Sequence, residues 1–541
     1  MQKYYYFVYI CKNFMVILMK KRFVFLLLVA CIAAKAQTIQ VSGEQSGVWD
    51  ADTVLVTGDV MVMDSLQIAP GTVVLFDGFY NIAVGKGASF EAIGTESDSI
   101  SFTIADTTGF HIYYSGKGGW NGFRVDRAGH FLMDYCVLEY SKAFINKVCN
   151  GGAMDFDNCE DVHVYHSTFH HNAANKRGGA VNGMESQVEM KGCSFHHNTV
   201  YDSIDLYLYG GAASFLNCDV EMREMEFREN DGSYCVGGAL SFDSCSVVLD
   251  RSVFVKNIGV NGGGFYLMRS FEKECRLSNL LFDDNYTLHF GGGFAVSDAS
   301  PEINNVLVVN NSSYGVSCNG IFYYGHCGAK LNNCIVYGNY APEPEVVVDT
   351  AQMWLWTTDD YAPEFRNCLI EGGQRFIHSA DYIKVWENNI DADPMFVDME
   401  NHDFRLAEGS PCIDAGNLQT PQYVLDGLDL NGIGRVKNNR IDIGPYEFSG
   451  AYVAEANVSS FAKLTGNPLG KHSRIEFDED LEGEVMMTVY SLTGRLAVQK
   501  AYESVSARSI AIGELVGSLV PGVYLIEVVN KGRSCTLKAV K

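Results

Sequence analysis

Two short motifs alternate through the middle of this chain, and both return after about 27 residues. The first is a glycine pair followed by Ala or Gly, beginning at Gly151, Gly178, Gly210, Gly237, Gly262 and Gly291. The second is Phe-x-x-Asn, at Phe169/Asn172, Phe195/Asn198, Phe227/Asn230, Phe254/Asn257 and Phe282/Asn285, which decays to Val308/Asn311 and Val336/Asn339. Because two independent motifs share one period, they predict a solenoid in which each repeat stacks on the previous one.

The segments between the motifs have the pattern of strands. Val162 to Tyr165 and Val247 to Leu249 are short apolar or alternating runs. Leucine-rich repeats share the period, but the Leu-x-x-Leu-x-Leu frame that they require is absent from the sequence. About three short strands per coil predict an all-β fold, namely a right-handed parallel β-helix whose coils stack at ~4.8 Å.

Stacked coils place equivalent residues in ladders, which gives each motif a structural interpretation. The phenylalanines are expected to form an inward-facing aromatic column. Each Asn is expected at a turn, where it adopts the left-handed conformation and hydrogen-bonds to the next Asn. The glycine pair allows a positive φ where the chain turns sharply.

The cysteines follow the same period, although 16 Cys in an exported chain would first suggest disulfides. Three lie eight residues after a glycine pair, and four lie two residues before the Phe-equivalent position: Cys159, Cys218, Cys245, and Cys136, Cys193, Cys334, Cys368. We therefore expect buried small hydrophobic side chains in ladders. Cys318 and Cys327, in a loop-like stretch, are the best candidates for a disulfide.

Residues 1–36 are predicted to be a signal peptide. Lys20, Lys21 and Arg22 precede a short apolar run, and Ala34-Lys35-Ala36 is a small-residue cleavage pattern. The alternative is a lipoprotein signal with Cys31 as the lipidated residue. No later stretch of sequence is long and apolar enough to span a membrane as a helix.

The rest of the chain divides into four predicted segments. Residues 37–130 are expected to form a cap and the first coils, and 131–449 the right-handed parallel β-helix. Residues 450–462 are small and polar, which is typical of a linker. Residues 463–541 show short alternating strands separated by turns, which predicts a small C-terminal β-sandwich.

The charge balance restricts the possible partners. Residues 37–541 contain 34 basic and 65 acidic residues, a net charge of −31. Such a surface repels nucleic acid and anionic membranes. It would also repel polyanionic glycans unless calcium bridged the contact.

No set of residues forms a recognisable catalytic signature, although many β-helix proteins act on polysaccharides. A lyase needs a base near a calcium-binding acidic cluster. Its candidates are the bases Lys176, Arg177, Arg251 and Lys256 and the acids Glu226, Glu229, Asp283 and Asp284. A hydrolase needs two carboxylates, and its candidates are Asp359 and Asp360 beside Trp354, Trp356 and Tyr361. The interpretations that we favour are charges on solvated turns and an aromatic capping loop over the solenoid.

Two histidine pairs occupy the same slots of consecutive coils. They are His170-His171 and His196-His197, between the Phe and the Asn of their repeats. His170 is expected to stack on His196, and His171 on His197. Four imidazoles on one face are candidate ligands for a transition metal, although repeat duplication explains them equally well.

The motif alternation over roughly residues 130–340 resembles the repeats of chlamydial polymorphic outer-membrane proteins and related right-handed β-helix proteins. Members of that family are surface-exposed and several are adhesins. Three later segments, 393–396, 409–417 and 442–447, resemble the end of choice-of-anchor β-helix proteins, in which an interchangeable surface-sorting tail follows. These resemblances imply a surface role.

The final segment is similar to one such tail, the type IX secretion sorting domain of Bacteroidetes. The matching features are Asn467-Pro468, Leu492-Thr493-Gly494-Arg495, Pro521-Gly522-Val523-Tyr524 and Leu537 to Lys541. The resemblance implies that the type IX secretion machinery carries the protein across the outer membrane, after which it is released or attached to surface lipopolysaccharide.

Two functions remain open from the sequence. The first is a secreted or cell-surface β-helix that binds a host or environmental glycan or protein without catalytic residues or a cofactor. The second is a polysaccharide lyase or glycoside hydrolase, for which calcium is a possible cofactor.

Overall fold

The computed structural model describes residues 37–107, 110, 118–143, 150–201, 208–314, 318–341, 351–437, 439–448 and most of 462–540. The expected signal peptide and, apart from Ala462, the expected linker lie outside the described residues. The chain divides into two compact units. The first comprises residues 1–394 with 414–424 and 439–445, and the second comprises 395–413, 425–438 and 446–541.

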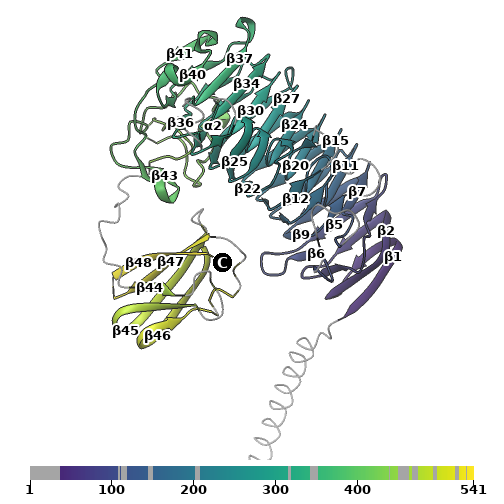
Figure 1. Cartoon of the computed structure of the whole chain (residues 1–541). Helices are drawn as coiled ribbons and strands as arrows, with labels where there is room; N and C mark the ends of the chain where they lie inside the picture. The colour runs from purple at the N-terminus through teal and green to yellow at the C-terminus, as the bar shows by residue number, and fades with distance from the viewer. Residues whose placement is uncertain are drawn as a thin grey trace, which may run out of the picture. The chain divides into compact units, whose positions relative to one another are not determined.

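The first unit is a β-solenoid in which successive coils pair in parallel, as predicted (Figure 1). Each coil contributes strands to three walls. Wall 1 contains β4 (Ile82–Val84), β7 (Phe123–Asp126), β11 (Met154–Asp157), β15 (Val181–Met184), β20 (Ala213–Leu216), β24 (Leu240–Asp243), β27 (Phe265–Met268), β30 (Phe294–Ser297), β34 (Ile321–Gly325), β37 (Met353–Thr357) and β40 (Ile377–His378).

Walls 2 and 3 follow in each coil, and β25 (Ser246–Val255) and β28 (Cys275–Asp283) run through both. Wall 2 also contains β5 (Ser89–Ile93), β8 (His130–Asp134), β12 (Val162–Tyr165), β16 (Gln187–Lys191), β21 (Asp219–Arg223), β31 (Glu302–Asn304), β35 (Lys330–Asn332), β38 (Glu364–Arg366) and β41 (Val385–Glu387). Wall 3 also contains β3 (Val73–Phe76), β6 (Ile100–Ile104), β9 (Cys136–Glu139), β13 (Thr168–His170), β17 (Ser194–His196), β22 (Glu226–Arg228), β32 (Leu307–Val309), β36 (Ile335–Tyr337) and β39 (Leu369–Ile370).

The solenoid begins at its first described residues. β1 (Thr38–Trp49) pairs along its length with β2 (Thr53–Ile68), and β2 pairs in turn with β3, β4 and β5. Each of these two long strands therefore passes through all three walls. The N-terminal segment therefore forms the first coils of the solenoid and not a separate cap.

Short strands precede the glycine corners and form two small parallel sheets. They are β10 (Lys142–Ala143), β14 (Ala173–Ala174) and β18 (Thr199–Val200), and β19 (Leu208–Tyr209), β23 (Cys235–Val236), β26 (Ile258–Asn261), β29 (Tyr286–Phe290) and β33 (Ser312–Ser313). The first glycine of each corner has a positive φ, 59° at Gly210 for example, as predicted. The second lies under the next coil, where a side chain has no room.

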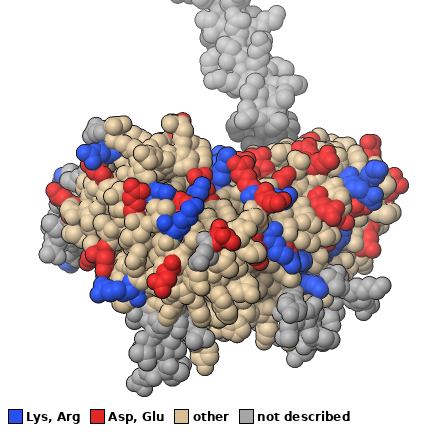
Figure 2. Space-filling view, turned by 90° about the horizontal axis from the view of Figure 1, so that it is seen from above, with Lys and Arg blue, Asp and Glu red and all other residues tan. Residues whose placement is uncertain are grey.

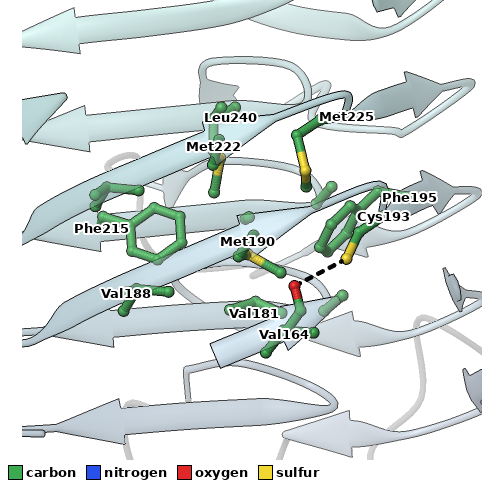
Figure 3. Close-up of a cluster of buried hydrophobic side chains, with 14 of the residues drawn as sticks. Val164, Val181, Val188, Met190, Cys193, Phe195, Phe215, Met222, Met225 and Leu240 are labelled. Carbon is green, nitrogen blue, oxygen red and sulfur yellow. Dashed lines mark hydrogen bonds between the residues drawn. The ribbon is translucent and has the colours of Figure 1, made fainter. Parts of the chain in front are cut away.

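One continuous hydrophobic core fills the interior of the coils. The inward residues of each strand contribute to it, as Phe195, Met190 and Val188 do in Figure 3. The cysteines belong to the same core: Cys193 Sγ donates to the carbonyl of Val164 at 3.3 Å (Figure 3). Burial raises the pKa of the Cys193 thiol to about 12, so this thiol stays protonated and unreactive.

The expected disulfide between Cys318 and Cys327 is wrong, because both residues are buried thiols that are not bonded to each other. Cys327 lies in the solenoid core, whereas Cys318 packs with Ala295 and Phe322 in a separate cluster. Their sulfur atoms donate to different carbonyls, those of Tyr324 and Ile321, each at 2.9 Å. A disulfide would require both side chains to lie on the same face of the wall.

The stack ends with β41 and with an isolated parallel bridge between Leu369 and Ile390, and the residues that follow do not add late coils. Instead, residues 414–424 and 439–445 pack back along the corner between walls 2 and 3. The amide of Asn305 donates to the carbonyls of Asp442 and Gly444, and Asn333 Nδ2 donates to Thr420 Oγ1 at 2.9 Å. Two of the three choice-of-anchor-like segments therefore contribute residues that cover this corner.

The remaining short elements lie between the last wall strands or after them. They are the 3-10 helices η1 (Asp359–Tyr361), η2 (Gly373–Phe376), η3 (Ala380–Tyr382) and η4 (Met399–Asn401), the antiparallel strands β42 (Phe396–Asp398) and β43 (Asp403–Leu406), and the helix α2 (Gln422–Leu425). No helix among the described residues is long and apolar enough to cross a membrane.

The C-terminal part of the second unit is an antiparallel β-domain with its own core. It contains β44 (Ala462–Thr465), β45 (Arg474–Ser491), β46 (Leu496–Ala511), β47 (Val523–Asn530) and β48 (Arg533–Val540). The sequence predicts short strands here, but β45 and β46 are long and change register along their pairing. Of the residue groups that resemble a sorting tail, 467–468, 492–495 and the first two residues of 521–524 lie outside the described residues.

Candidate functional site

The phenylalanine column is present and entirely buried. The ring centroids of Phe169, Phe195, Phe227, Phe254 and Phe282 are separated by 4.6, 5.1, 4.8 and 4.8 Å in order, and the rings are stacked. Each side chain is 0% exposed. These residues hold neighbouring coils in register and are inaccessible to a ligand.

The asparagine ladder is also present, but its backbone differs from the prediction. The side chains of Asn172, Asn198, Asn230, Asn257 and Asn285 are buried, and each amide donates to the next Asn Oδ1 at 2.9–3.0 Å. The left-handed residue is the one before each Asn. Because that residue turns the chain, the Asn side chain points into the coil and satisfies backbone groups there, including the carbonyls of earlier phenylalanines.

The four histidines stack in the order expected. The rings of His170 and His196 are 4.9 Å apart and nearly parallel, and those of His171 and His197 are 5.2 Å apart. Burial, followed by repulsion from His171 and His197, lowers the pKa of His170 to about 4. Burial and the neighbouring imidazoles lower the pKa of His196 to about 3, so both rings are neutral at pH 7.

The candidate lyase residues do not converge on one site. Arg177 stacks on the ring of Tyr209 at 3.9 Å, and Lys256 Nζ lies 3.9 Å from Asp284. Glu226 accepts from Arg228 of its own strand, and Glu229 lies 2.9 Å from His197. Asp283 is buried and accepts from Asn310 Nδ2 at 3.1 Å.

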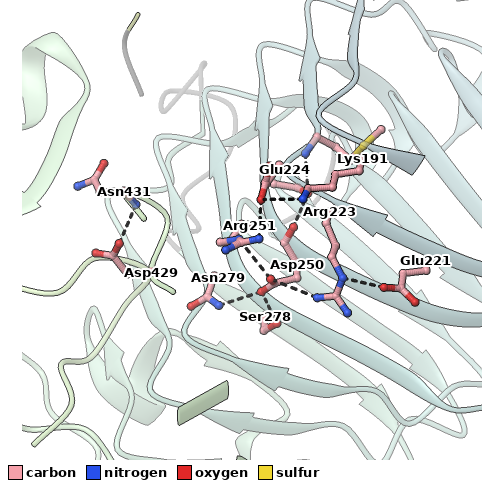
Figure 4. A network of polar contacts seen from close by, with 12 residues as sticks. Lys191, Glu221, Arg223, Glu224, Asp250, Arg251, Ser278, Asn279, Asp429 and Asn431 are labelled. Atoms are coloured by element: carbon pink, nitrogen blue, oxygen red, sulfur yellow. Dashed lines mark hydrogen bonds and ion pairs between the residues drawn. The ribbon is translucent and has the colours of Figure 1, made fainter. Parts of the chain in front are cut away.

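Arg251 belongs to a surface network of ion pairs on wall 2 (Figure 4). It donates to Glu224 at 2.6 Å and lies 3.5 Å from Asp250, which also accepts from Ser278 and Asn279. A base committed to two carboxylates in this way is not available to a substrate. The interpretation as charges on turns and outer strand positions therefore describes these residues better than a lyase site.

The aromatic residues near Asp360 do not form the expected capping loop. Trp354 and Trp356 lie in β37, which pairs with β34 and β40, so they belong to the outer surface of wall 1. The sequence does not predict a wall strand here because β37 lies two coils beyond the last regular glycine-pair motif. Asp360 is exposed at η1, and the side chain of Asp359 lies outside the described residues.

An aromatic strip, defined as Tyr324, Trp354 and Trp356, results on wall 1. The two Trp rings are 5.7 Å apart with planes 11° from parallel, and Tyr324 meets Trp356 edge-on at 5.5 Å. Trp356 is 54% exposed and Tyr324 is 46% exposed. Large aromatic faces held on a rigid strand and open to solvent are typical of a binding surface.

An acidic cavity of about 300 Å³ lies on the outer surface of wall 2. Its lining contains one histidine, His163, and six carboxylates, and no Lys or Arg is among the lining residues: Glu160, Asp161, Glu189, Asp219, Glu221 and Glu274. Elsewhere on the surface, acidic and basic side chains are interspersed with wide uncharged areas, as in the view of Figure 2. Arg223 pairs with Glu221 and Arg276 pairs with Glu274, which leaves an excess of acidic groups in the lining. That excess favours a cation or a hydroxyl-rich ligand over an anionic one.

Hydrogen bonds already engage the central groups of this cavity. His163 bridges Asp161 and Glu189, with nitrogen–oxygen distances of 2.7 and 3.0 Å. Hydrogen bonding from His130, and also from His163, holds the pKa of Asp161 below its usual value. Glu189 lies directly opposite Glu221 on the next coil, and Arg223 donates to Glu221 at 2.7 Å. Both glutamates act as acceptors here, whereas a glycosidase requires one carboxyl group that donates a proton.

Sequence reasoning missed this cavity, although a signal exists. Glu189 and Glu221 each lie eleven residues after a glycine pair, and strand alternation places that slot on the outer surface. The slot becomes visible only when the repeats are aligned strand by strand, because the preceding coil contains one additional residue before β12.

Residues 92–277 match the family model described as the right handed beta helix region. No curated protein matches the chain.

Proposed function

We propose that this right-handed parallel β-helix repeat protein is exported to the cell surface or the medium, where it binds a neutral glycan without catalysis. The observation that carries the proposal is the aromatic strip on wall 1. Sugar rings present apolar faces that stack on indole and phenol rings, and the strip offers such rings on adjacent strands that cannot rearrange easily.

The electrostatics of the solenoid favour the same class of ligand. A net charge of −31 over residues 37–541 disfavours uronate-rich chains, nucleic acid and anionic lipid. A neutral glycan carries no charge to repel, and its hydroxyl groups can donate to exposed carboxylates.

Export is supported by the sequence resemblances. A signal peptide over residues 1–36 would direct the chain across the inner membrane, and the type IX machinery would recognise residues 463–541. Attachment to surface lipopolysaccharide would give an adhesin, and release would give a secreted binding protein.

The alternative is a carbohydrate-active enzyme, and the acidic cavity is the observation that favours it. Glu189 and Glu221 lie on neighbouring coils about 4.8 Å apart along the stack, which is close to the carboxylate spacing of retaining glycosidases. Both already accept hydrogen bonds, so binding remains our preferred function.

We expect Trp356→Ala to weaken glycan binding at least tenfold, because it removes the most exposed ring of the strip. The measurement is titration of the processed protein with neutral oligosaccharides that a glycan array selects, and the matched control is Tyr314→Ala, which removes a ring that is 58% exposed outside the strip. Equal losses in both variants would exclude the strip as the site. New reducing ends on incubation with these oligosaccharides would instead establish an enzyme, and Glu189→Gln and Glu221→Gln would then locate its active site.

We expect a chain that ends at residue 462 to stay in the periplasm of its source bacterium, while the full chain reaches the surface or the medium. The reason is that the deleted domain is the proposed signal for the type IX machinery. Immunoblots of periplasm, outer membrane and medium measure the distribution. Undiminished export of the shortened chain would contradict the sorting role, and it would leave the glycan experiment unaffected.

A further inference from the structure

The histidine pairs have a geometry that the stacking of repeats alone does not require. The Nδ1 atoms of His170 and His171 are 2.9 Å apart, and those of His196 and His197 are 3.1 Å apart. Consecutive residues of a strand normally point to opposite faces. Here the second residue of each pair is left-handed, with φ of 54° and 57°, so the chain turns and the two rings meet at nearly right angles.

These distances match the spacing of two ligands on one metal ion. Imidazole nitrogens bind first-row transition metals at about 2.0–2.1 Å, so two nitrogens at a right angle on one ion are about 2.9 Å apart. A tetrahedral arrangement would separate them by about 3.3 Å. The spacing in the first pair equals the right-angle value, whereas the spacing in the second pair lies midway between the two values. The first pair therefore favours a metal with square-planar or octahedral coordination, such as Cu²⁺ or Ni²⁺.

A second observation points to the same nitrogens. His170 Nε2 lies 3.3 Å from Glu139 Oε2, and His197 Nε2 lies 2.9 Å from Glu229 Oε2. A carboxylate at Nε2 holds the proton there and leaves the Nδ1 lone pair directed at the partner ring. Histidine ligands of metals are oriented in this way, with the second nitrogen donating to a carboxylate.

One ion cannot use all four rings. Equivalent rings on neighbouring coils are 4.9 and 5.2 Å apart, so an ion midway between the pairs would lie about 2.8 Å from each nitrogen, too far for coordination. Each pair would therefore hold its own ion, with water completing the shell.

We propose that the two stacked histidine pairs, His170 with His171 and His196 with His197, each chelate one Cu²⁺ or Ni²⁺ ion through their Nδ1 atoms. Without metal, a hydrogen bond joins the two nitrogens of a pair. On binding, the proton of His171 or His196 moves from Nδ1 to Nε2, so the ring stays neutral and no net proton is released. Glu139 and Glu229 are positioning residues. The side chain of His170 is 18% exposed and that of His197 is 49% exposed, so ions reach the pairs from solvent.

The test is titration of the full processed chain, without a polyhistidine tag, with CuCl₂ and NiCl₂ at pH 7.5, followed by calorimetry and by electron paramagnetic resonance for copper. We expect binding with up to two ions per chain, the second weaker because of repulsion at about 5 Å, and a resonance pattern of two nitrogen ligands per ion. His170→Ala should abolish one site. The double variant His170→Ala/His197→Ala should lower copper affinity at least a hundredfold with an unchanged melting temperature in the absence of metal.

The matched control is His166→Ala. His166 is also left-handed and paired with a carboxylate, Asp134 at 2.8 Å, but its ring stacks on Tyr135 instead of meeting a second imidazole. This variant should bind copper as the wild type does. Glu139→Gln should weaken the first pair about tenfold while the two-nitrogen resonance pattern persists. Equal copper binding by the wild type and the double variant, or a loss with His166→Ala alone, would overturn the proposal.

Discussion

Replacing Asn230 by alanine is expected to lower the free energy of unfolding of the solenoid by about 3–6 kcal/mol. Asn230 is buried, and its Oδ1 accepts from both the backbone N–H and the side-chain amide of Asn198. Its own amide donates to Phe195 O and to Asn257 Oδ1, each at 2.9 Å. Truncation leaves these buried groups without partners, and each costs about 1–3 kcal/mol. Water entering the space recovers a part of this loss.

The matched control is Arg228→Ala, two residues earlier on β22. Arg228 lies on the outer surface and pairs with Glu226 of its own strand, so its loss should cost less than about 1 kcal/mol. Urea unfolding measures both variants, and hydrogen exchange at the Asn198 amide reports the broken rung directly. Similar midpoints for the two variants would mean that the asparagine ladder contributes little to stability.

The repeats made the solenoid predictable, because period, strand length and ladder residues are all local properties of the sequence. The same reasoning placed Phe195 and Cys193 in the interior, where the structure has them, and it predicted the hydrogen bond from Asn198 to the next Asn of the ladder. It assigned the left-handed conformation to the wrong residue, because a positive φ can be recognised only where Gly occupies it. His197 and Glu229 take that conformation without any compositional signal.

The candidate sites were harder to predict because they depend on register between coils. Trp356 lies beyond the last regular motif, so only the pairing of β37 with β34 places it on an outer wall. The opposition of Glu189 and Glu221 likewise depends on the strand register of two coils. The histidine pairs were the exception, since their slots repeat exactly one coil apart, yet the approach of their Nδ1 atoms depends on backbone dihedral angles that no motif encodes.

The largest loss is expected from the second glycine of a corner, because backbone occupies the space that a side chain would need. A Cβ on Gly211 would lie 2.1 Å from the carbonyl oxygen of Gly238 on the next coil. Each equivalent glycine is covered in the same way, so the coils can admit a methyl group only by separating, which breaks the hydrogen bonds on all three walls. We expect Gly211→Ala to cost more than about 4 kcal/mol or to prevent folding.

The third position of the same corner provides the control, since the repeats place Ala at 212 and 239 but Gly at 264. A Cβ on Gly264 would lie 2.8 Å from the ring of Phe282 and from the carbonyl oxygen of Gly293, so these groups must shift slightly. Ala212 and Ala239 show that the coils can hold a methyl group at this slot. Gly264→Ala should therefore fold and lose at most about 1–3 kcal/mol. Soluble yield, circular dichroism and thermal melting distinguish the two. A melting temperature of Gly211→Ala within a few degrees of the wild type would contradict this prediction. It would mean that neighbouring coils separate at little cost in free energy, and that the second glycines of the corners do not set the spacing between coils.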